Sequence, residues 1–428
     1  MKKMQTTLLL LAVGGTLALA RAGTAAAASP AHGRTYEPCA KVADMTFGTD
    51  GWMFEPWEFN DTFSFSATAA LQELNEAFRA RGSTLVLVPV PSRPYKYLSK
   101  IDPTLYPNLK FSPETYKQSW QTMIQAARAT GVTVVDLLPS VENYSTSETG
   151  EEFFYPRDHH WTTSGVQVIA PVVAQAISAL KLPGLNKLTV KMDGFSLKKE
   201  GFNSGAFADR YTKACGSRAA SSPAYKVRYT KQTGLLDDTV ATIGVFGDSF
   251  GLAYPDNNFA PLLEWNTKLN TVNYSLAGGG SLGALTGYLA DPAVNHSLPQ
   301  VVVVPFMGAV PNDANQYRQI TATLRGCPGP VQAVQSAAEA AVTFQADGAA
   351  HSAVHLAFTQ DTQKVKLTLD YQDGTSEKMT LNRSNADYFK GDRRNFYVSL
   401  PADRTVKDLQ VSTDHAMNPQ DSVSLCKR

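Results

Sequence analysis

The chain has 428 residues, of which 43% are apolar and 18% are charged. Its formal net charge is +1 at pH 7, so bulk electrostatics gives no reason to expect a nucleic-acid partner. A chain of this length exceeds what one ordinary hydrophobic core accommodates, which predicts two domains.

The first 28 residues have the pattern of a cleaved secretory signal peptide. Lys2 and Lys3 precede the apolar run TTLLLLAVGGTLALA, and the alanine-rich AGTAAAASPA follows with several small-residue cleavage sites. The alternative is a membrane anchor, but the apolar run is shorter than the ~20 residues that a spanning helix needs. No later segment is apolar enough to span a bilayer, so we expect an exported protein with no membrane span in its mature chain.

From about residue 65 to 310, helix and strand patterns alternate. Continuous apolar strands between helices favour a mainly parallel sheet that is covered by helices on both faces. The expected helices are SATAALQELNEAFRARG (66–82), SPETYKQSWQTMIQAARATG (112–131), TTSGVQVIAPVVAQAISALK (162–181) and SLGALTGYLA (281–290). The expected strands are STLVLVPV (83–90), VTVVDLL (132–138), ATIGVFGDS (241–249), the start of TVNYSLAGGG (271–280) and QVVVVPF (300–306).

The character of the sequence changes after RGCPGPVQ (325–332). Period-two alternation appears in 364–382, 395–400 and 406–414, and QDGT (372–375) is typical of a hairpin turn. This pattern predicts a C-terminal β-sandwich of roughly one hundred residues.

The four cysteines, Cys39, Cys215, Cys327 and Cys426, contain no C-x-x-C pair. An even count without close pairs favours two disulfides over a zinc site and is consistent with export. Three pairings are possible. Cys327 opens the last hundred residues and Cys426 closes them, which favours one bond around the small domain and leaves Cys39 to pair with Cys215.

VFGDSFG (245–251) places Ser249 at the end of a predicted buried strand, directly after Gly247 and Asp248. Ligands gather at the carboxyl ends of strands in open α/β sheets, and a tight turn there exposes a side chain. A helix cap formed by Asp248 or Ser249 would explain the same letters. A catalytic interpretation therefore requires a base and an acid elsewhere.

YPRDHHWTTSG (155–165) supplies both groups. In an extended segment alternate residues share a face, so Asp158 and His160 would point into one cleft. His160 would take the Ser249 proton while Asp158 orients the imidazole. We interpret His159 as a solvated neighbour. The remaining histidines show no ligand spacing, so we expect no metal at this segment.

GGGSLG (278–283) fits G-x-G-x-x-G, but it comes late in the domain and no acidic residue follows the next strand. We therefore expect no nucleotide cofactor. Glycine backbone N–H groups could instead hold an oxyanion, with Gly279 and Gly280 acting beside the Ser249 N–H. A simple tight turn explains the glycines equally well.

With these residues in view, the chain resembles the AlgX-like alginate O-acetyltransferases, a family with an SGNH-hydrolase-like fold. The resemblance covers nearly the whole mature chain and rests on EPC, DGWMF, FYPRDHHWTTSG, ACGS, FGDSF, SLAGGGSLGALTGYL, RGCPG and LCKR. It implies an SGNH-like domain over 29–326 and a β-sandwich carbohydrate-binding module over 327–428. It also supports Ser249 as nucleophile, His160 as base, Asp158 as orienting acid, and the two disulfides given above.

The resemblance implies a periplasmic enzyme that moves acetyl groups through an acetyl-serine onto hydroxyls of an exported polysaccharide, alginate or a related polyuronate. The acetyl donor would be handed on by other proteins of a secretion and acetylation complex. The stretches VVPFMGAVPND and LDYQDGTSE depart from the family pattern, which leaves the polymer open. Candidate substrate-binding residues are Tyr254, Arg93, Tyr371, Arg393 and Arg394, and Tyr388 and Tyr397 lie near the last two.

Two alternatives remain open from the sequence. The same triad would hydrolyse acetyl esters if water rather than a sugar reached the acyl-serine. A non-catalytic polysaccharide-binding scaffold could also retain the fold, although it would have no need to keep Ser249, His160 and Asp158 together.

Overall fold

The computed structural model describes residues 40–185, 189–216, 221–232, 241–252, 258–290, 298–336, 342–383 and 392–427. The predicted signal peptide, Cys39, Tyr254 and Tyr388 lie outside these residues.

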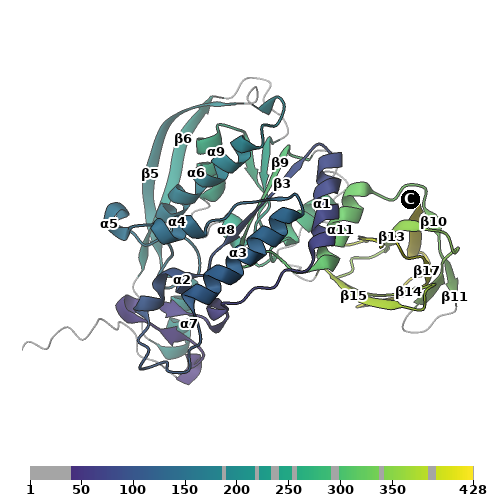
Figure 1. Cartoon of the computed structure of the whole chain (residues 1–428), viewed down its shortest axis with the longest axis horizontal. Helices are drawn as coiled ribbons and strands as arrows, with labels where there is room; N and C mark the ends of the chain where they lie inside the picture. Colours follow the sequence, from purple (N-terminus) through teal and green to yellow (C-terminus); the bar gives the residue numbers. More distant parts are fainter. Residues whose placement is uncertain are drawn as a thin grey trace, which may run out of the picture.

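Five parallel strands form the central sheet, in the order β4-β3-β9-β7-β8. The two long strands at its centre, β3 and β9, pair along their whole length (Figure 1). The strands are β3 (Thr84–Val90), β4 (Thr133–Val134), β7 (Ile243–Val245), β8 (Thr271–Asn273) and β9 (Val301–Met307). This order confirms the predicted parallel sheet.

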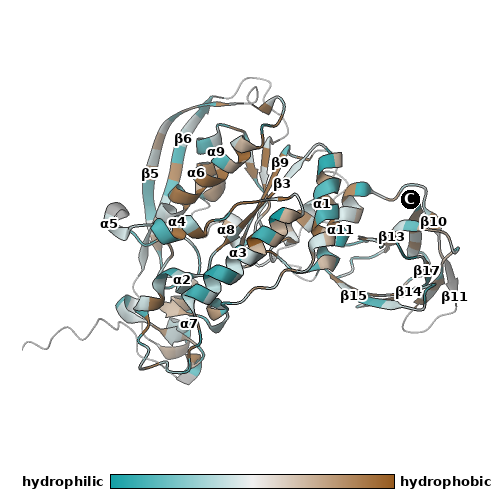
Figure 2. Cartoon of the chain, viewed as in Figure 1, coloured by the Kyte–Doolittle hydropathy of each residue, from teal (hydrophilic) through white to brown (hydrophobic). Residues whose placement is uncertain are grey.

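Helices cover both faces of the sheet because alternate strand residues point to opposite sides. In β3, Leu85 and Leu87 join one buried cluster while Val86 and Val88 join the other. Hydrophobic residues accordingly follow the sheet strands and the inner sides of the helices (Figure 2). One cluster includes α1 (Thr68–Ala80), α3 (Pro113–Ala129), α10 (Gly283–Ala290) and α11 (Ala314–Arg325), and the other includes α6 (Thr163–Ala179) and α9 (Phe259–Thr267).

The strand expected over 132–138 is shorter than predicted. Asp136 accepts a hydrogen bond from the Leu138 N–H at 3.0 Å, and α4 (Leu138–Asn143) begins there with Pro139 in its first turn. A proline is favourable in the first turn of a helix, where its missing N–H has no partner to lose. β4 therefore ends at Val134, and the rest of the apolar run leads into α4.

A long antiparallel ribbon, β5 (Lys191–Asn203) with β6 (Ser222–Gln232), is an element that the sequence patterns did not predict. It lies against α6 and α9 (Figure 1). Its buried and exposed residues alternate, but glycines and register shifts interrupt the pattern. Between the sheet strands, the chain also forms α2 (Arg93–Tyr97), η4 (Leu98–Lys100), α5 (Thr146–Thr149), α7 (Ala206–Cys215) and α8 (Ser249–Leu252).

The N-terminal segment packs beside α7 and α2 (Figure 1). Its elements are η1 (Ala40–Val42), β1 (Thr46–Phe47), η2 (Thr49–Gly51), β2 (Met53–Phe54) and η3 (Pro56–Phe59). Phe47 and Met53 share a small buried cluster with Phe207 and Tyr211 of α7. The start of the described chain is thereby fixed against a helix more than 150 positions further along the sequence.

The C-terminal residues form two antiparallel sheets, β10-β18-β13-β16 and β11-β12-β17-β14-β15, which enclose one hydrophobic core. This confirms the predicted sandwich, and β14 and β15 flank the predicted turn at 372–375. The strands are β10 (Val331–Gln332), β11 (Val334–Ser336), β12 (Val342–Gln345), β13 (His351–Ala357), β14 (Lys364–Tyr371), β15 (Ser376–Asn382), β16 (Asn395–Ser399), β17 (Val406–Thr413) and β18 (Ser422–Lys427).

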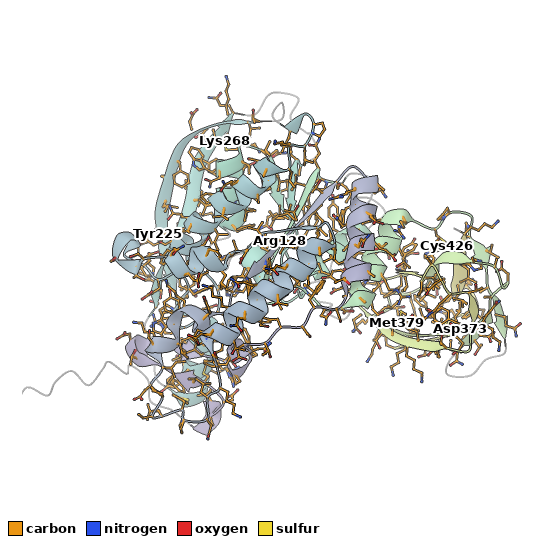
Figure 3. The ribbon with its side chains drawn as sticks, in the orientation of Figure 1. Arg128, Tyr225, Lys268, Asp373, Met379 and Cys426 are labelled. Carbon is orange, nitrogen blue, oxygen red and sulfur yellow. A yellow bond between two sulfur atoms is a disulfide. The ribbon has the colours of Figure 1, made fainter. Side chains whose placement is uncertain are left out.

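Cys327 and Cys426 form a disulfide, with their Cα atoms 4.8 Å apart, so this predicted bond is confirmed. Cys426 lies within the sandwich, in β18 (Figure 3). Cys215 is itself disulfide-bonded, and its predicted partner Cys39 lies outside the described residues.

The sandwich is docked on α11. Arg318 Nε donates to the Ser399 carbonyl at 2.8 Å, and Arg383 donates to Gln319 Oε1 at 3.3 Å. Arg383 and Gln319 are buried at this junction. In the parts of the chain that the structure describes, no helix is both long and apolar enough to cross a membrane.

Candidate active site

Ser249 follows the carboxyl end of β7, a strand of the central sheet, and begins the short helix α8. Asp248, just before it, accepts hydrogen bonds from the Phe250 N–H at 2.8 Å and the Met307 N–H at 3.1 Å. Burial raises the pKa of Asp248, while these N–H donors oppose the rise. The Asp248 carboxylate therefore ties α8 to the end of β9, and it is engaged in fixing the turn that presents Ser249.

Only glycine fits at position 247 in this turn. A Cβ there would lie 2.3 Å from the Pro305 carbonyl oxygen and 2.7 Å from Pro305 Cγ. The Gly247 N–H donates to Ser275 Oγ at 2.9 Å, and its carbonyl accepts from the Leu276 N–H at 3.0 Å. The backbone before Ser249 is therefore held on both sides by β9 and by the segment after β8.

Asp158 and His160 belong to a tight loop that is closed by a bridge between Phe154 and Trp161. The loop is turned rather than extended as predicted, because Asp158 Oδ1 accepts the His160 N–H at 3.0 Å. The two side chains meet nevertheless: His160 Nδ1 lies 2.5 Å from the same oxygen. The other Asp158 oxygen accepts the Ala206 N–H at 2.9 Å, at the start of α7.

Burial would raise the pKa of Asp158, but the hydrogen bond and charge of His160 outweigh it and hold the pKa well below its usual range. An ionised carboxylate only accepts hydrogen bonds, so the proton of the short bond belongs to His160 Nδ1. Nε2 is then the acceptor nitrogen. This Nε2 atom is buried and has no hydrogen-bond partner among the described residues.

Ser249 and His160 are brought to the same place by the residues on either side of Ser249. The Phe250 ring lies 4.9 Å from the His160 ring, centroid to centroid, and Asp248 is close enough to His160 to interact with its charge. Within the described residues, no hydrogen bond joins Ser249 to His160. The residues on either side of Ser249 therefore lie next to His160, whose Nε2 has no partner among the described residues.

The His159 side chain is largely buried and packs against neighbouring rings, so the prediction that it is a solvated neighbour is wrong. Its ring packs on His160 at 4.0 Å and on Phe207 at 5.6 Å, and its side chain is 22% exposed. Burial lowers the pKa of His159 to about 3.

Ligand atoms of Asp158, His159 and His160 lie within 4.8 Å of one another, which is close enough for one cation. Both Asp158 oxygens already accept N–H groups, however, and His160 Nδ1 is engaged by one of them. The donor set therefore fits a proton relay better than a metal centre.

The backbone N–H of Ser249 donates no hydrogen bond within the described residues, so it is available to an oxyanion. Gly279 is different: its N–H donates to the Leu276 carbonyl at 3.1 Å, so the structure does not support its predicted role. The N–H of Gly280 has no partner among the described residues. Gly278 and Gly280 both take positive φ, near 70°, as the tight-turn alternative requires.

Arg93 was predicted to bind substrate, but it is fully buried. Its guanidinium pairs with the buried Glu58 through two 2.6 Å contacts. It also donates to the carbonyls of Met53 at 2.6 Å and Tyr155 at 2.9 Å. The prediction for Arg93 is therefore wrong: its donors face protein rather than solvent, and its role is to hold the N-terminal segment against the Asp158 loop.

The other candidate substrate residues lie in the sandwich. Tyr371 is 2% exposed and donates to Glu377 Oε2 at 2.8 Å, so its ring belongs to the core and is closed to a polymer. Arg394 is exposed and pairs with Asp361 at 3.0 Å. Arg393 is partly buried just before β16. Tyr254 lies outside the described residues.

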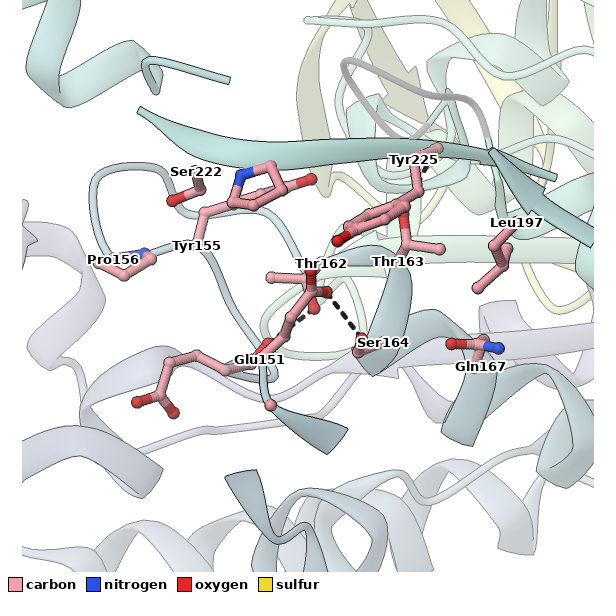
Figure 4. Close-up of a pocket in the computed structure, with 13 residues that line it drawn as sticks. Glu151, Tyr155, Pro156, Thr162, Thr163, Ser164, Gln167, Leu197, Ser222 and Tyr225 are labelled. Atoms are coloured by element: carbon pink, nitrogen blue, oxygen red, sulfur yellow. Dashed lines mark hydrogen bonds between the residues drawn. The ribbon is translucent and has the colours of Figure 1, made fainter. Parts of the chain in front are cut away.

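A pocket of about 490 Å³ lies beside the Asp158 loop, between the segment at 150–156, the N-terminus of α6 and the β5–β6 ribbon (Figure 4). Tyr155 and Tyr225 line it together with Glu151, which accepts from Ser164 Oγ at 2.7 Å. Ser249, His160 and Asp158 do not line it. The pocket therefore adjoins the back of the loop and is separate from the reacting groups.

Several contributors to the site were missed by sequence reasoning. Phe250 packs on His160, and the Ala206 N–H donates to Asp158. Arg93, paired with Glu58, donates to the Tyr155 carbonyl at the start of the loop. An available signal for the N-terminal support was the run of large aromatic residues in DGWMFEPWEF (50–59).

Comparison with known proteins identifies the family and the fold. A family model described as the SGNH hydrolase-like domain of acetyltransferase AlgX matches residues 45–306. The alginate biosynthesis protein AlgX of Pseudomonas fluorescens is 27% identical over 65% of this chain and 59% of its own length. A probable alginate O-acetylase AlgJ of Pseudomonas putida is 25% identical over 61% of this chain and 69% of its own length.

The solved structure of Pseudomonas aeruginosa AlgX superposes with a TM-score of 0.70 at 21% identity, and the match covers 90% of this chain and 94% of that one. That likeness supports the fold of both parts of the chain. In the AlgX comparison above, the chain spans about three fifths of its curated relative. The family model, however, matches more than half of the present sequence. The chain therefore belongs to the family of SGNH hydrolase-like acetyltransferase domains of the AlgX type.

Proposed function

We propose that this protein transfers acetyl groups onto hydroxyls of an exported polysaccharide, alginate or a related polyuronate, through an acetyl ester on Ser249. The observation that carries the proposal is the Asp158–His160 pair, because it fixes the imidazole with a buried, unpartnered Nε2 beside the Ser249 turn. The names of the AlgX and AlgJ relatives supply the substrate class.

In the first half-reaction, Ser249 Oγ attacks the acetyl carbonyl of the donor while His160 Nε2 takes the hydroxyl proton. The Ser249 N–H, with Gly280 as the second candidate donor, stabilises the oxyanion. His160 then returns its proton to the departing donor group, and the acetyl group remains on Ser249.

In the second half-reaction, a sugar hydroxyl gives its proton to His160 Nε2 and attacks the acetyl-serine. Collapse of the tetrahedral intermediate releases the acetylated sugar, and Ser249 recovers a proton from His160. Asp158 stays ionised throughout and stabilises the imidazolium that forms twice in the cycle.

The sandwich, residues 327–428, is proposed to hold the polymer near the site, which would raise the local acceptor concentration. Its exposed Arg394 is the candidate that remains for contact with carboxylates, together with Arg393. We also propose a periplasmic location and delivery of the acetyl donor by partner proteins. These assignments rest on the family resemblance and on the disulfide in the sandwich.

The test is turnover of a chromogenic acetyl ester, with and without a mannuronate hexasaccharide, with products identified by mass spectrometry. Ser249→Ala and His160→Ala should each abolish nearly all turnover, because triad members act as a unit. Asp158→Asn should cost about 10⁴-fold, since the amide misdirects the imidazole tautomer. Hydrolysis that is unchanged by the saccharide, without acetylated sugar, would identify an esterase instead.

A further inference from the structure

Trp57 is an exposed aromatic side chain at the edge of the proposed active site. Among the described residues, three large hydrophobic side chains stand out as exposed, Trp57 at 49%, Leu105 at 43% and Phe202 at 64%. Of these, Trp57 has a ring contact with the Asp158 loop: its indole meets the His159 ring edge-on, with centroids 5.6 Å apart and an interplanar angle of 77°.

A continuous series of rings leads from Trp57 to the reacting groups. His159 packs on His160 at 4.0 Å, and both imidazoles contact Phe250, at 5.8 Å and 4.9 Å. Phe250 directly follows Ser249. The indole is thus separated from the catalytic imidazole by the single ring of His159, so a molecule resting on it would extend toward the proposed base.

The turn that carries Trp57 is held in place by a capping box and a buried ion pair. Glu58 Oε1 accepts the Glu55 N–H at 2.9 Å in a capping box, and the same carboxylate pairs with buried Arg93. Arg93 also donates to the Tyr155 carbonyl, three residues before Asp158. The exposed indole and the catalytic loop are therefore fixed to each other through a buried ion pair, and stacking on Trp57 requires little reordering of the protein.

Charges next to the indole are already paired within the protein. Arg210 bridges Glu55 at 2.5 Å and Asp44 at 2.8 Å, so the guanidinium that reaches this turn is already paired with two carboxylates. Recognition at Trp57 therefore rests on the apolar face of a ring. The C–H face of a pyranose is a suitable partner, because an aromatic side chain presents a flat, rigid and apolar surface.

We propose that Trp57 is an acceptor-binding residue on which one sugar ring of the polysaccharide stacks, so that a neighbouring hydroxyl reaches His160. This inference rests on the proposed function and adds the acceptor subsite to it. As an acceptor contact, Trp57 would act in the second half-reaction and leave the first unchanged. Because the contact is apolar, its contribution should change little with salt.

The experiment compares Trp57→Ala and Trp57→Phe with wild type, using Leu105→Ala as the control for loss of an exposed apolar side chain. In Trp57→Ala, turnover of the chromogenic ester without acceptor should stay within about two-fold of wild type, which shows that the fold and triad are intact. The KM for the mannuronate hexasaccharide should rise on the order of ten-fold, the effect of losing one aromatic contact. The KM of Trp57→Phe for the hexasaccharide should lie between the values of wild type and Trp57→Ala. The KM of Leu105→Ala should match that of wild type.

A binding measurement separates this inference from the proposed function. Titrating Ser249→Ala with the hexasaccharide by calorimetry measures affinity without any reaction, and adding Trp57→Ala to that variant should weaken binding by a similar factor. Equal affinity in the two variants would overturn the subsite even if acetyl transfer is confirmed. Weakened binding would support it even if the chemistry proved to be hydrolysis.

Discussion

Removal of the Arg93 guanidinium should be among the most destabilising single substitutions in the α/β domain. Arg93 and Glu58 both have side chains that are 0% exposed, and two contacts of 2.6 Å join them. Arg93→Met fills a similar volume but leaves the Glu58 carboxylate buried without a counter-charge. Breaking a buried pair in this way costs about 3–5 kcal/mol.

The structure also predicts whether adding Glu58→Met to Arg93→Met raises or lowers the stability. In the double variant Arg93→Met with Glu58→Met, no charge is left buried, so part of the loss should be recovered. Recovery is incomplete because the carbonyls of Met53 and Tyr155 still lose their donors. We expect the double variant to be more stable than Arg93→Met by about 1 kcal/mol or more.

The assay is urea-induced unfolding followed by tryptophan fluorescence, with the midpoints compared across the cycle. Arg210→Met is the matched control: Arg210 also pairs with two carboxylates, but its side chain is 40% exposed, so its loss should cost less than about 1 kcal/mol. If Arg93→Met costs no more than Arg210→Met, the assignment of Arg93 as the buried support of the Asp158 loop is wrong.

Three further predictions follow from the site and the sandwich. Because burial lowers the pKa of His159 to about 3, the unfolded chain binds a proton that the folded one excludes between pH 6.5 and 3, and stability falls as the pH drops through this window. His159→Leu should flatten that slope in unfolding measured against pH; an unchanged slope contradicts it. Cys327→Ser with Cys426→Ser removes a disulfide that closes a loop with a sequence separation of 99, so the free energy of unfolding of the sandwich should fall by ~4–5 kcal/mol. A loss below about 1 kcal/mol would refute a stabilising role for this disulfide. Gly247→Ala forces a Cβ to 2.3 Å from the Pro305 carbonyl oxygen and should cost about 1–3 kcal/mol and most of the ester turnover; wild-type kinetics would show that the turn tolerates a side chain.

The sequence predicted the sheet and the sandwich because both rest on periodic patterns. The strands β3, after its first residue Thr84, and β9 are continuously apolar, and β14 and β15 alternate around a turn at 372–375. The β5–β6 ribbon was not predicted because glycines and register shifts interrupt its alternation of buried and exposed residues. The strand predicted over VTVVDLL was too long because its continuous apolar run hid two local helix-start signals, the hydrogen bond from the Leu138 N–H to Asp136 and Pro139 in the first helical turn.

The Asp158–His160 contact could be predicted because its partners are two residues apart. Arg93 could not be placed in the same way, since its burial depends on Glu58, 35 positions away, and on carbonyls of two other segments. A basic residue near a predicted active site is compatible with either substrate contact or structural support. Only the packing of η3 against the Asp158 loop separates the two.

The most direct test of the central claim is a search for acetyl on Ser249. Wild-type protein is mixed with the chromogenic acetyl ester, quenched in acid within the first turnover and digested, and the peptide that contains Ser249 is examined by mass spectrometry. The account predicts acetyl on Ser249 that disappears when the mannuronate hexasaccharide is added before the quench, and no acetyl in His160→Ala. Acetylated saccharide formed by Ser249→Ala at the wild-type rate would contradict it.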